Sequence, residues 1–431
     1  MSIVALLLVF LIAIMGGGPS RQAPGAAASE LAAGGAFVNT PSLALHAQPG
    51  GDKTIALLKQ GETVRVLEEV RAGTGVWEHV TTSAGLAGYV SAFGLSGLAP
   101  PPLAGAEREI LGYFTPGSGE LSFAAHAPSL STLSPWMWRL MPDGSLQGCG
   151  FAEPGGCDAQ AMANTLGDAG AHGLRVLALV HNFGGTTFDQ AGLHQLLASA
   201  TAQKAAIENL AGALTSWGVN GIQIDLEALA PADRDAFSAF ISDLARRLHQ
   251  SQLRVTIAVP ALTAAYAAQP WGRAYDYAAL AGSVDRMMLM TYDEHHLSSA
   301  PGPIASIGWA EQVIQYALSL GIPPQKLVLG VAGYGYDWSP QDQSTSHWQA
   351  RAVRYDRVMQ LAAQYQTPIL WDATAEVPHL SYGNHQVWFE DRFSISHKLD
   401  LVDRYNLGGI AIWQLGQEDP GVWSLFDELL H

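Results

Sequence analysis

Residues 221–227 read Gly-Ile-Gln-Ile-Asp-Leu-Glu, a short apolar run that ends in two carboxylates. Side chains alternate between the two faces of a strand, so Gln223, Asp225 and Glu227 share one face while the aliphatic side chains share the other. Continuous apolar runs of this length are typical of parallel strands that are covered on both faces. We therefore predict a buried strand that presents three polar groups on one side of its carboxyl-terminal half.

Similar runs recur along the chain from about residue 108, and helical patterns such as 203–217 and 232–250 lie between them. Eight strands that alternate with helices predict an α/β fold, a closed (β/α)8 TIM barrel over residues 107–431. A doubly wound open sheet is the alternative, but no Gly-x-Gly-x-x-Gly follows the first strand, so nothing supports nucleotide binding. The predicted strands are 110–114, 132–137, 175–180, 221–226, 254–259, 286–291, 327–331 and 409–413.

The interval between the seventh and eighth predicted strands is long, and strand-like alternation recurs within it. We predict a small α+β insertion at about 335–400, forming one wall of the cleft. Residues 99–106 are rich in proline and predict a stiff linker before the barrel. Residues 16–35, rich in Gly, Ala, Ser and Pro, predict a flexible tether.

Residues 36–98 have a different character, with short strand-like runs at 54–58, 63–67, 77–81 and 88–90. Gly-containing turn signals separate these runs, which predicts a small all-β barrel. Their order resembles a bacterial SH3-like domain. The resemblance rests on the opening pattern from Leu43 to Gly50, the Gly61-Glu62 turn, Trp77, and the closing Gly88-Tyr89-Val90. Such domains often bind cell-wall peptides, and a rigid spacer is the alternative role.

The chain of 431 residues carries a formal charge of −16, and 48% of its residues are hydrophobic. A large core can therefore be buried, and the acidic balance disfavours nucleic acid as a partner. A neutral polymer such as a glycan suits this charge better. We expect a monomer that needs no cofactor.

Residues 3–15 form an apolar run that is shorter than the ~20 residues needed to span a bilayer. The run, followed by small residues at 26–28, predicts that 1–28 acts as a signal peptide. No Lys or Arg precedes it, so retention as a membrane anchor is the alternative. Either reading predicts an exported protein, secreted or associated with the cell wall or membrane.

Cys149 and Cys157 lie in a Gly-rich stretch and do not form a Cys-x-x-Cys pair, so a structural zinc site is not expected. Outside the cytosol the two could form a disulfide, and two unpaired thiols are the alternative. The acidic and histidine residues at 293–296 are adjacent and cannot easily converge on one ion, so we predict no metal site.

The ends of the other predicted strands carry aromatic, amide and carboxylate side chains. Catalytic groups of TIM barrels lie at the carboxyl ends of the strands. Two neighbouring carboxylates cannot ionise independently, so one of them is available as a proton donor near neutral pH. Aromatic rings beside carboxylates and amides suit a sugar, which has apolar ring faces and hydroxyl edges. These further residues are Tyr113, Asn182, Tyr292, Asp293 and Trp413.

The chain from about 108 to 431 resembles glycoside hydrolase family 18. The fourth-strand motif of that family is Asp-Gly-x-Asp-x-Asp-x-Glu, and residues 220–227 here read Asn-Gly-Ile-Gln-Ile-Asp-Leu-Glu. Asn220 and Gln223 depart from the motif. With these two amides the sequence is more similar to the spore-germination and cortex-lytic branch of the family than to ordinary chitinases. Further segments similar to that branch are 275–277, 290–295, 301–303, 335–338, 387–391 and 408–413.

The resemblance implies substrate-assisted catalysis, in which the acetamide of the substrate is the nucleophile. Glu227 would be the acid and base, while Asp225 and Tyr292 would orient the acetamide, and Trp413 would form the floor beneath the reacting sugar. Weaker expectations are Asp293, Asn182 and Gln223, as contacts to hydroxyl or acetamide groups or as support for them. Tyr113 could bind substrate or be structural.

The resemblance to the spore-germination branch, together with the SH3-like domain, implies hydrolysis of bonds next to N-acetylglucosamine in peptidoglycan. A chitinase or other chitooligosaccharide hydrolase is the alternative enzyme. A glycan-binding, lectin-like barrel is the alternative without catalysis, and the presence of Glu227 argues against it.

Overall fold

The computed structural model describes residues 35–38, 42–51, 53–59, 62–72, 75–82, 84–91, 95–97, 108–151, 157–340 and 348–430. The chain divides into two compact units, Met1–Leu98 and Ala99–His431. The predicted export segment 1–28 and the predicted linker 99–106 lie outside the described residues. Within the described ranges, no helix has the length and apolar character required to traverse a bilayer.

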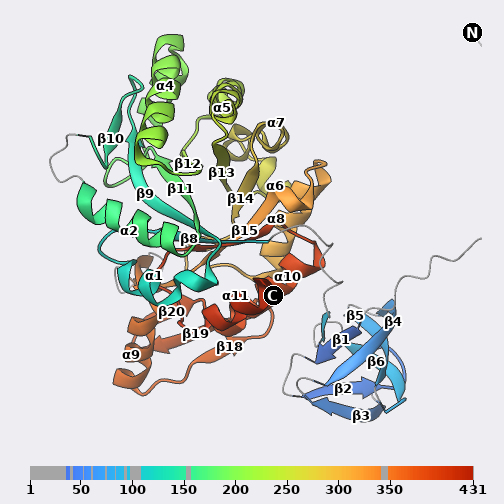
Figure 1. Ribbon diagram of the computed structural model, residues 1–431. Helices are drawn as coiled ribbons and strands as arrows, with labels where there is room; N and C mark the ends of the chain where they lie inside the picture. The colour runs from blue at the N-terminus through green and yellow to red at the C-terminus, as the bar shows by residue number, and fades with distance from the viewer. Residues whose placement is uncertain are drawn as a thin grey trace, which may run out of the picture. The chain divides into compact units, whose positions relative to one another are not determined.

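The larger unit contains a ring of eight parallel strands (Figure 1). The ring closes because the first strand pairs with both the second and the last. All eight predicted strands are confirmed, most within one residue at each end. They are β8 (Glu109–Phe114), β9 (Thr132–Leu140), β11 (Arg175–His181), β12 (Gly221–Asp225), β13 (Arg254–Pro260), β14 (Arg286–Met290), β15 (Leu327–Ala332) and β21 (Gly409–Trp413).

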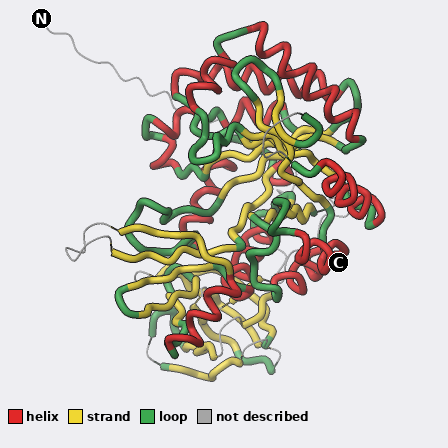
Figure 2. The backbone as a smooth tube through the Cα atoms, turned by 90° about the vertical axis from the view of Figure 1, so that its left-hand side faces the viewer, coloured by secondary structure: helices red, strands yellow, loops and turns green. Residues whose placement is uncertain are grey.

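Helices surround this ring and contact its outer face (Figure 2). The two helices predicted in most detail are confirmed as α4 (Ala200–Trp217) and α5 (Arg234–His249). The others are α1 (Glu120–His126), α2 (Ala159–Ala171), α3 (Gln190–Leu197), α6 (Ala264–Ala267), α7 (Tyr277–Ser283), α8 (Ile307–Ser319), α10 (Arg392–Arg404) and α11 (Val422–Leu430). Short 3-10 turns lie at Ala127–Ser129, Pro231–Asp233, Trp271–Ala274 and Pro324–Lys326.

Strand alternation produces two separate apolar cores in the barrel. Outward side chains such as Ile222 and Ile224 pack against the helices in the larger core. Inward side chains such as Leu177, Leu179 and Met288 fill the barrel interior. The inward side chains of β12, Gln223 and Asp225, are polar. The interior of the barrel is therefore polar along the carboxyl-terminal half of this strand.

The amino-terminal end of the barrel holds a buried carboxylate among three arginines. Glu109 is 2% exposed and accepts a hydrogen bond from the Thr132 hydroxyl at 2.7 Å. Guanidinium nitrogens of Arg175, Arg254 and Arg286 lie 3.6–3.7 Å from its oxygens. Each arginine begins a strand, so the barrel is closed at this end by a cluster of charges that compensate one another.

Strand β9 continues to Leu140, beyond the predicted end at residue 137. The extension pairs antiparallel with β10 (Leu146–Gly148), a strand that the sequence analysis did not anticipate. Just after β10, Cys149 and Cys157 form a disulfide, so this alternative of the two is confirmed. The indole N–H of Trp138 donates to the Cys149 carbonyl at 2.9 Å, which anchors the bridged loop to the barrel.

The predicted α+β insertion between β15 and β21 is confirmed as an antiparallel sheet with one helix, α9 (Tyr355–Tyr365). Helix α10 contacts β15 and β21 and belongs to the barrel, so the insertion ends near 389 instead of 400. The five strands of this sheet are β16 (Tyr334–Pro340), β17 (Trp348–Arg354), β18 (Leu370–Asp372), β19 (Val377–Tyr382) and β20 (His385–Phe389).

The amino-terminal unit is a seven-stranded antiparallel sheet in the order β3-β2-β6-β5-β4-β1-β7. Its all-β class is as predicted, and Leu45, Val80 and Val90 lie in its small core. The resemblance to an SH3-like domain stays a prediction. The first strand begins at residue 35, the last residue of the predicted tether, and neither it nor the last strand was anticipated. The strands are β1 (Gly35–Val38), β2 (Ser42–His46), β3 (Thr54–Lys59), β4 (Thr63–Ala72), β5 (Gly75–Thr82), β6 (Ala87–Ser91) and β7 (Leu95–Gly97).

Candidate active site

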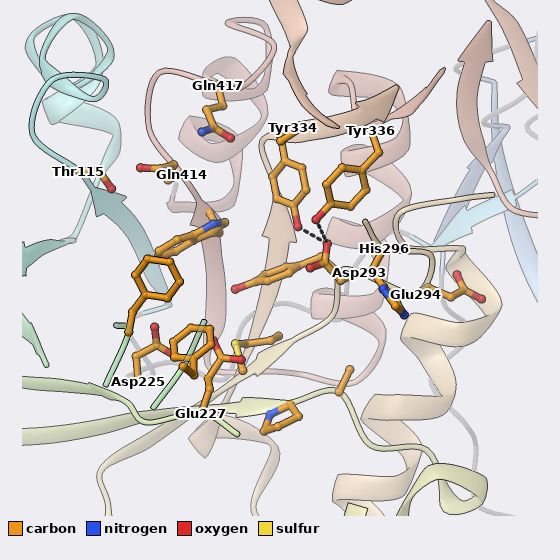
Figure 3. Close-up of a pocket in the computed structure, with 18 of the residues that line it drawn as sticks. Thr115, Asp225, Glu227, Asp293, Glu294, His296, Tyr334, Tyr336, Gln414 and Gln417 are labelled. Carbon is orange, nitrogen blue, oxygen red and sulfur yellow. Dashed lines mark hydrogen bonds between the residues drawn. The ribbon is translucent and has the colours of Figure 1, made fainter. Parts of the chain in front are cut away.

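A cavity of about 1030 Å³ opens at the carboxyl-terminal ends of the barrel strands (Figure 3). Its lining comes from strand ends, from the loops after them and from the insertion. Five of the eight predicted sugar-site residues line it, and three lie behind the lining. Those on the lining are Asp225, Glu227, Tyr292, Asp293 and Trp413, and those behind are Tyr113, Asn182 and Gln223.

Asp225 and Glu227 lie together in the cavity, at the end of β12 and just beyond it (Figure 3). Asp225 is 5% exposed, and its Oδ1 atom has no hydrogen-bond partner among the described residues. Burial raises the pKa of Asp225 to about 7. The pKa of Glu227 is also raised, first by burial and then by the negative charges of Asp225 and Asp293. A carboxyl group that still carries its proton near neutral pH can therefore face the cavity.

Tyr292 follows β14 and lines the same cavity. Burial raises its pKa well above the ordinary value, and the neighbouring Tyr113 and Asp225 add to the shift. The phenol consequently keeps its proton at any physiological pH. A neutral hydroxyl of this kind can donate a hydrogen bond to a carbonyl oxygen of a ligand.

Gln223 points inward one layer below Asp225 and is fully buried. Its amide nitrogen donates to the Tyr113 hydroxyl at 2.9 Å, and its amide oxygen accepts from the Thr256 hydroxyl. The ring of Tyr113 in turn lies 5.2 Å from that of Trp413, centroid to centroid. Gln223 thus holds Tyr113, and the ring of Tyr113 packs against Trp413. Trp413 is joined to Gln414 by a cis peptide bond.

Asn182 is 2% exposed and makes its hydrogen bonds to protein backbone. Its side-chain oxygen accepts from the Glu227 N–H, and its amide nitrogen donates to the Glu227 carbonyl, both at 2.9 Å. A weaker bond of 3.4 Å reaches the Asp189 carbonyl. The described geometry therefore gives this residue a supporting position.

Asp293 lies across the cavity from Glu227 and is held by the insertion. The hydroxyls of Tyr334 and Tyr336, both on β16, donate to its Oδ1 atom, the latter at 2.9 Å (Figure 3). Partial desolvation by the cavity walls raises the pKa of Asp293, and the two hydrogen bonds partly oppose that effect. The residue is nevertheless exposed to solvent on the side of the cavity. Its backbone is left-handed, with φ of 63°.

Aromatic residues that the sequence analysis did not select extend the lining in two directions. Trp136 lies 5.8 Å from Trp413, and Phe183 lies beyond it. At another part of the lining, Tyr266 and Trp271 have ring centroids 5.6 Å apart. Trp136 could have been found, because it alternates with Ser134 and so points inward at a strand end. Tyr266 lies in the short helix α6 and Trp271 begins the 3-10 turn after it, and elements this short carry no such periodic signal.

His181 stacks on Trp136, with the two ring centroids 4.0 Å apart. Burial lowers its pKa to about 3, and the charge of Arg139 adds to the effect. Its Nδ1 atom accepts the Phe183 N–H at 3.0 Å. The imidazole is therefore neutral at ordinary pH and packs against Trp136, which lines the cavity.

Residues 293–296 do not converge on one point. Glu294 accepts two hydrogen bonds from Ser306, while the His295 ring lies 2.9 Å from the Ala300 carbonyl. Within the part of the chain that the structure describes, no three His, Cys, Asp or Glu residues are grouped so as to hold a metal ion.

Comparison with known proteins places this fold among sugar-cleaving enzymes. The model of the family described as glycosyl hydrolases family 18 matches residues 167–418. YdhD of Bacillus subtilis, named as a candidate sporulation-specific glycosylase, is 33% identical over 70% of this chain and 69% of its own length. The cortical fragment-lytic enzyme of Bacillus cereus is 35% identical over 54% of this chain, a match that spans only about half (55%) of that enzyme. A chitinase structure from Chromobacterium violaceum superposes with a TM-score of 0.67 and 27% identity, covering 74% of this chain and 98% of that one.

Proposed function

The chain belongs to glycoside hydrolase family 18 and is a glycosidase, and on that premise we propose that it hydrolyses bonds next to N-acetylglucosamine in peptidoglycan. The observation that carries the proposal is the carboxyl pair at an aromatic cavity, in which Asp225 is buried, Glu227 is half-buried, and the pKa of each is raised. The cortical fragment-lytic relatives favour peptidoglycan as the polymer.

The proposed reaction begins with transfer of the Glu227 proton to the glycosidic oxygen. The acetamide oxygen of the sugar attacks the anomeric carbon as the bond to the leaving group breaks, giving an oxazolinium ion. Asp225 accepts the acetamide N–H, and its negative charge stabilises the positive ring. The Tyr292 hydroxyl donates to the acetamide oxygen and fixes its direction.

In the second half of the reaction, Glu227 removes a proton from water as the water oxygen attacks the anomeric carbon. The bond from that carbon to the acetamide oxygen breaks, so the acetamide is regenerated and Glu227 is again protonated. Two displacements at the same carbon restore the original arrangement, so the product keeps the anomeric configuration of the substrate. Trp413 offers its ring face to the reacting sugar. The Gln223 amide has no acidic proton, and it is hydrogen-bonded to the Tyr113 and Thr256 hydroxyls. The Oδ1 atom of Asp225, which has no partner among the described residues, is therefore available to the substrate.

A chitinase is the second candidate, because the superposed chitinase shares the fold over most of the barrel. A glycan-binding role without hydrolysis is disfavoured by the same carboxyl pair. Binding alone gives no reason to bury Asp225 beside a second acid, with its Oδ1 atom unpartnered among the described residues.

The experiment that separates these candidates incubates residues 29–431 with purified peptidoglycan and, separately, with chitooligosaccharides. Glu227→Gln is the blank, and the products are identified by mass spectrometry. New N-acetylglucosamine reducing ends from peptidoglycan, absent from the blank, would support the proposal. Cleavage of chitooligosaccharides alone would favour the chitinase. Absence of product from both substrates would favour the glycan-binding role without hydrolysis.

We further propose that the protein is exported through residues 1–28 and acts as a monomer outside the cytosol. The disulfide between Cys149 and Cys157 supports export, because such bonds persist in oxidising compartments. Fractionation of expressing cells tests the location, and light scattering of the purified protein tests the monomer. Protein confined to the cytosol, or a stable dimer, would contradict these proposals.

A further inference from the structure

Glu227 lies where the backbone support of the sheet has ended. Strand β12 stops at Asp225, whose register partner on the neighbouring strand is His181. Beyond this pair, neither strand supplies further ladder bonds to hold residue 227. The next residue, Ala228, has a left-handed backbone with φ of 57°, which costs an L-residue free energy unless its surroundings hold it.

The side chain of Asn182 takes over from the ladder at this point. Its amide both accepts the Glu227 N–H and donates to the Glu227 carbonyl, at 2.9 Å in each case. Two directly opposed residues exchange such a pair of bonds in an antiparallel ladder, and here one side chain makes both bonds at the end of a parallel ladder. Gln190 adds a third bond, from its amide nitrogen to the Ala228 carbonyl at 2.8 Å.

Asn182 is itself fixed by the loop between β11 and α3. The Asp189 N–H donates to the Asn182 carbonyl at 2.9 Å, and Gly184 and Thr187 are bonded within the same turn at 2.7 Å. Asp189 then caps α3 by accepting the Gly192 N–H. The amide therefore reaches Glu227 from a rigid base.

We propose that Asn182 is a positioning residue, which with help from Gln190 holds the backbone of the acid Glu227 in its reactive place. This inference rests on the proposed function and adds a second pair of residues to it. Misplacement of a reacting group by about 1 Å can cost about 100-fold in rate, so a backbone hold of this kind acts on the chemical step.

The test compares Asn182→Ala, Gln190→Ala and Glu227→Gln with wild type on soluble glycan strands from purified peptidoglycan. The matched control is Asn209→Ala, because Asn209 also donates its amide to a backbone carbonyl, that of Gly144 at 2.9 Å, away from the cavity. We expect Asn182→Ala to lower kcat about 10- to 100-fold with KM within about twofold of wild type. Gln190→Ala should lower kcat a few-fold, and Asn209→Ala should leave it unchanged.

Glycan affinity measured in the inactive Glu227→Gln background should be the same with and without Asn182→Ala. Should Asn182→Ala fail to fold, Gln190→Ala still tests the proposal, because Gln190 is exposed and its bond is peripheral to the core. Wild-type kcat in both variants, or an equal loss in Asn209→Ala, would overturn the positioning role alone. Full turnover by Glu227→Gln would instead overturn the proposed function.

Discussion

The two ends of the barrel bury carboxylates in opposite ways. At the amino-terminal end, Glu109 is surrounded by Arg175, Arg254 and Arg286 and accepts a hydrogen bond from Thr132. At the carboxyl-terminal end, Asp225 is also buried, but its charged neighbour is the acidic Glu227. Each of the two carboxylates has one oxygen without a hydrogen-bond partner among the described residues, so the contrast lies in the sign of the charges beside it. A compensated carboxylate maintains the fold, whereas an uncompensated one is a source of reactivity that the fold must tolerate.

Substitution of the proposed acid should have the largest effect. We expect Glu227→Gln to lower kcat by about 100- to 10,000-fold, because the amide cannot give a proton to the leaving oxygen. Its free energy of unfolding should be equal to or above that of wild type, since a neutral amide replaces an acid that lies close to the charges of Asp225 and Asp293. Rate assays and denaturant melts measure the two quantities, and a stability loss that matches the activity loss would contradict the contrast.

The opposite outcome is expected at the other end. Glu109→Gln leaves three arginines without their counter-charge and should destabilise the protein by about 3–5 kcal/mol. The kcat of the protein that remains folded should stay near that of wild type. A large fall in kcat at a temperature well below the melting transition would break the separation between the two ends.

The contribution of Asp225, at the carboxyl-terminal end of the barrel, to the free energy of unfolding should depend on pH. Folding raises the pKa of Asp225 to about 7 from an ordinary value of ~3.9, so the folded state binds this proton more tightly than the unfolded state does. The contribution is complete below about pH 4 and is lost as pH rises toward 7. Asp225→Asn, which cannot ionise, should therefore exceed wild type in stability at pH 8 by on the order of 2–4 kcal/mol, but not at pH 4. Urea melts at both values check this, and an equal difference at both would be inconsistent with it.

The smallest effect is expected at the rim of the cavity. Tyr336→Phe removes one of the two hydroxyls that hold Asp293, a loss of about 1 kcal/mol, or roughly fivefold in kcat/KM. Tyr365→Phe is the control, because Tyr365 is on the exposed side of the insertion and its ring stacks on Tyr382. Equal kinetics for the two variants would show that the hold on Asp293 does not matter to turnover.

Strand alternation is a local rule, and what it governs was predictable from the sequence. A second local signal, the short continuous apolar run, located all eight barrel strands, while alternation put Gln223, Asp225 and Glu227 on one face. The same rule could have found Trp136. The partners of Glu109 in its charge cluster are 23 to 177 positions away along the chain. Asn182 and Glu227, which are joined by two bonds, are 45 positions apart. Such contacts depend on the closed geometry of the barrel, and no local pattern signals them.

The participation of the substrate is the central chemical claim, and it can be tested by altering the substrate alone. The rate at which new reducing ends appear would be measured on peptidoglycan strands before and after chemical removal of the N-acetyl groups. The account predicts that wild-type protein cleaves the acetylated strands and that deacetylation lowers the rate at least about 100-fold. Equal rates on the two substrates would contradict it, because Asp225 and Tyr292 would then have no acetamide to orient.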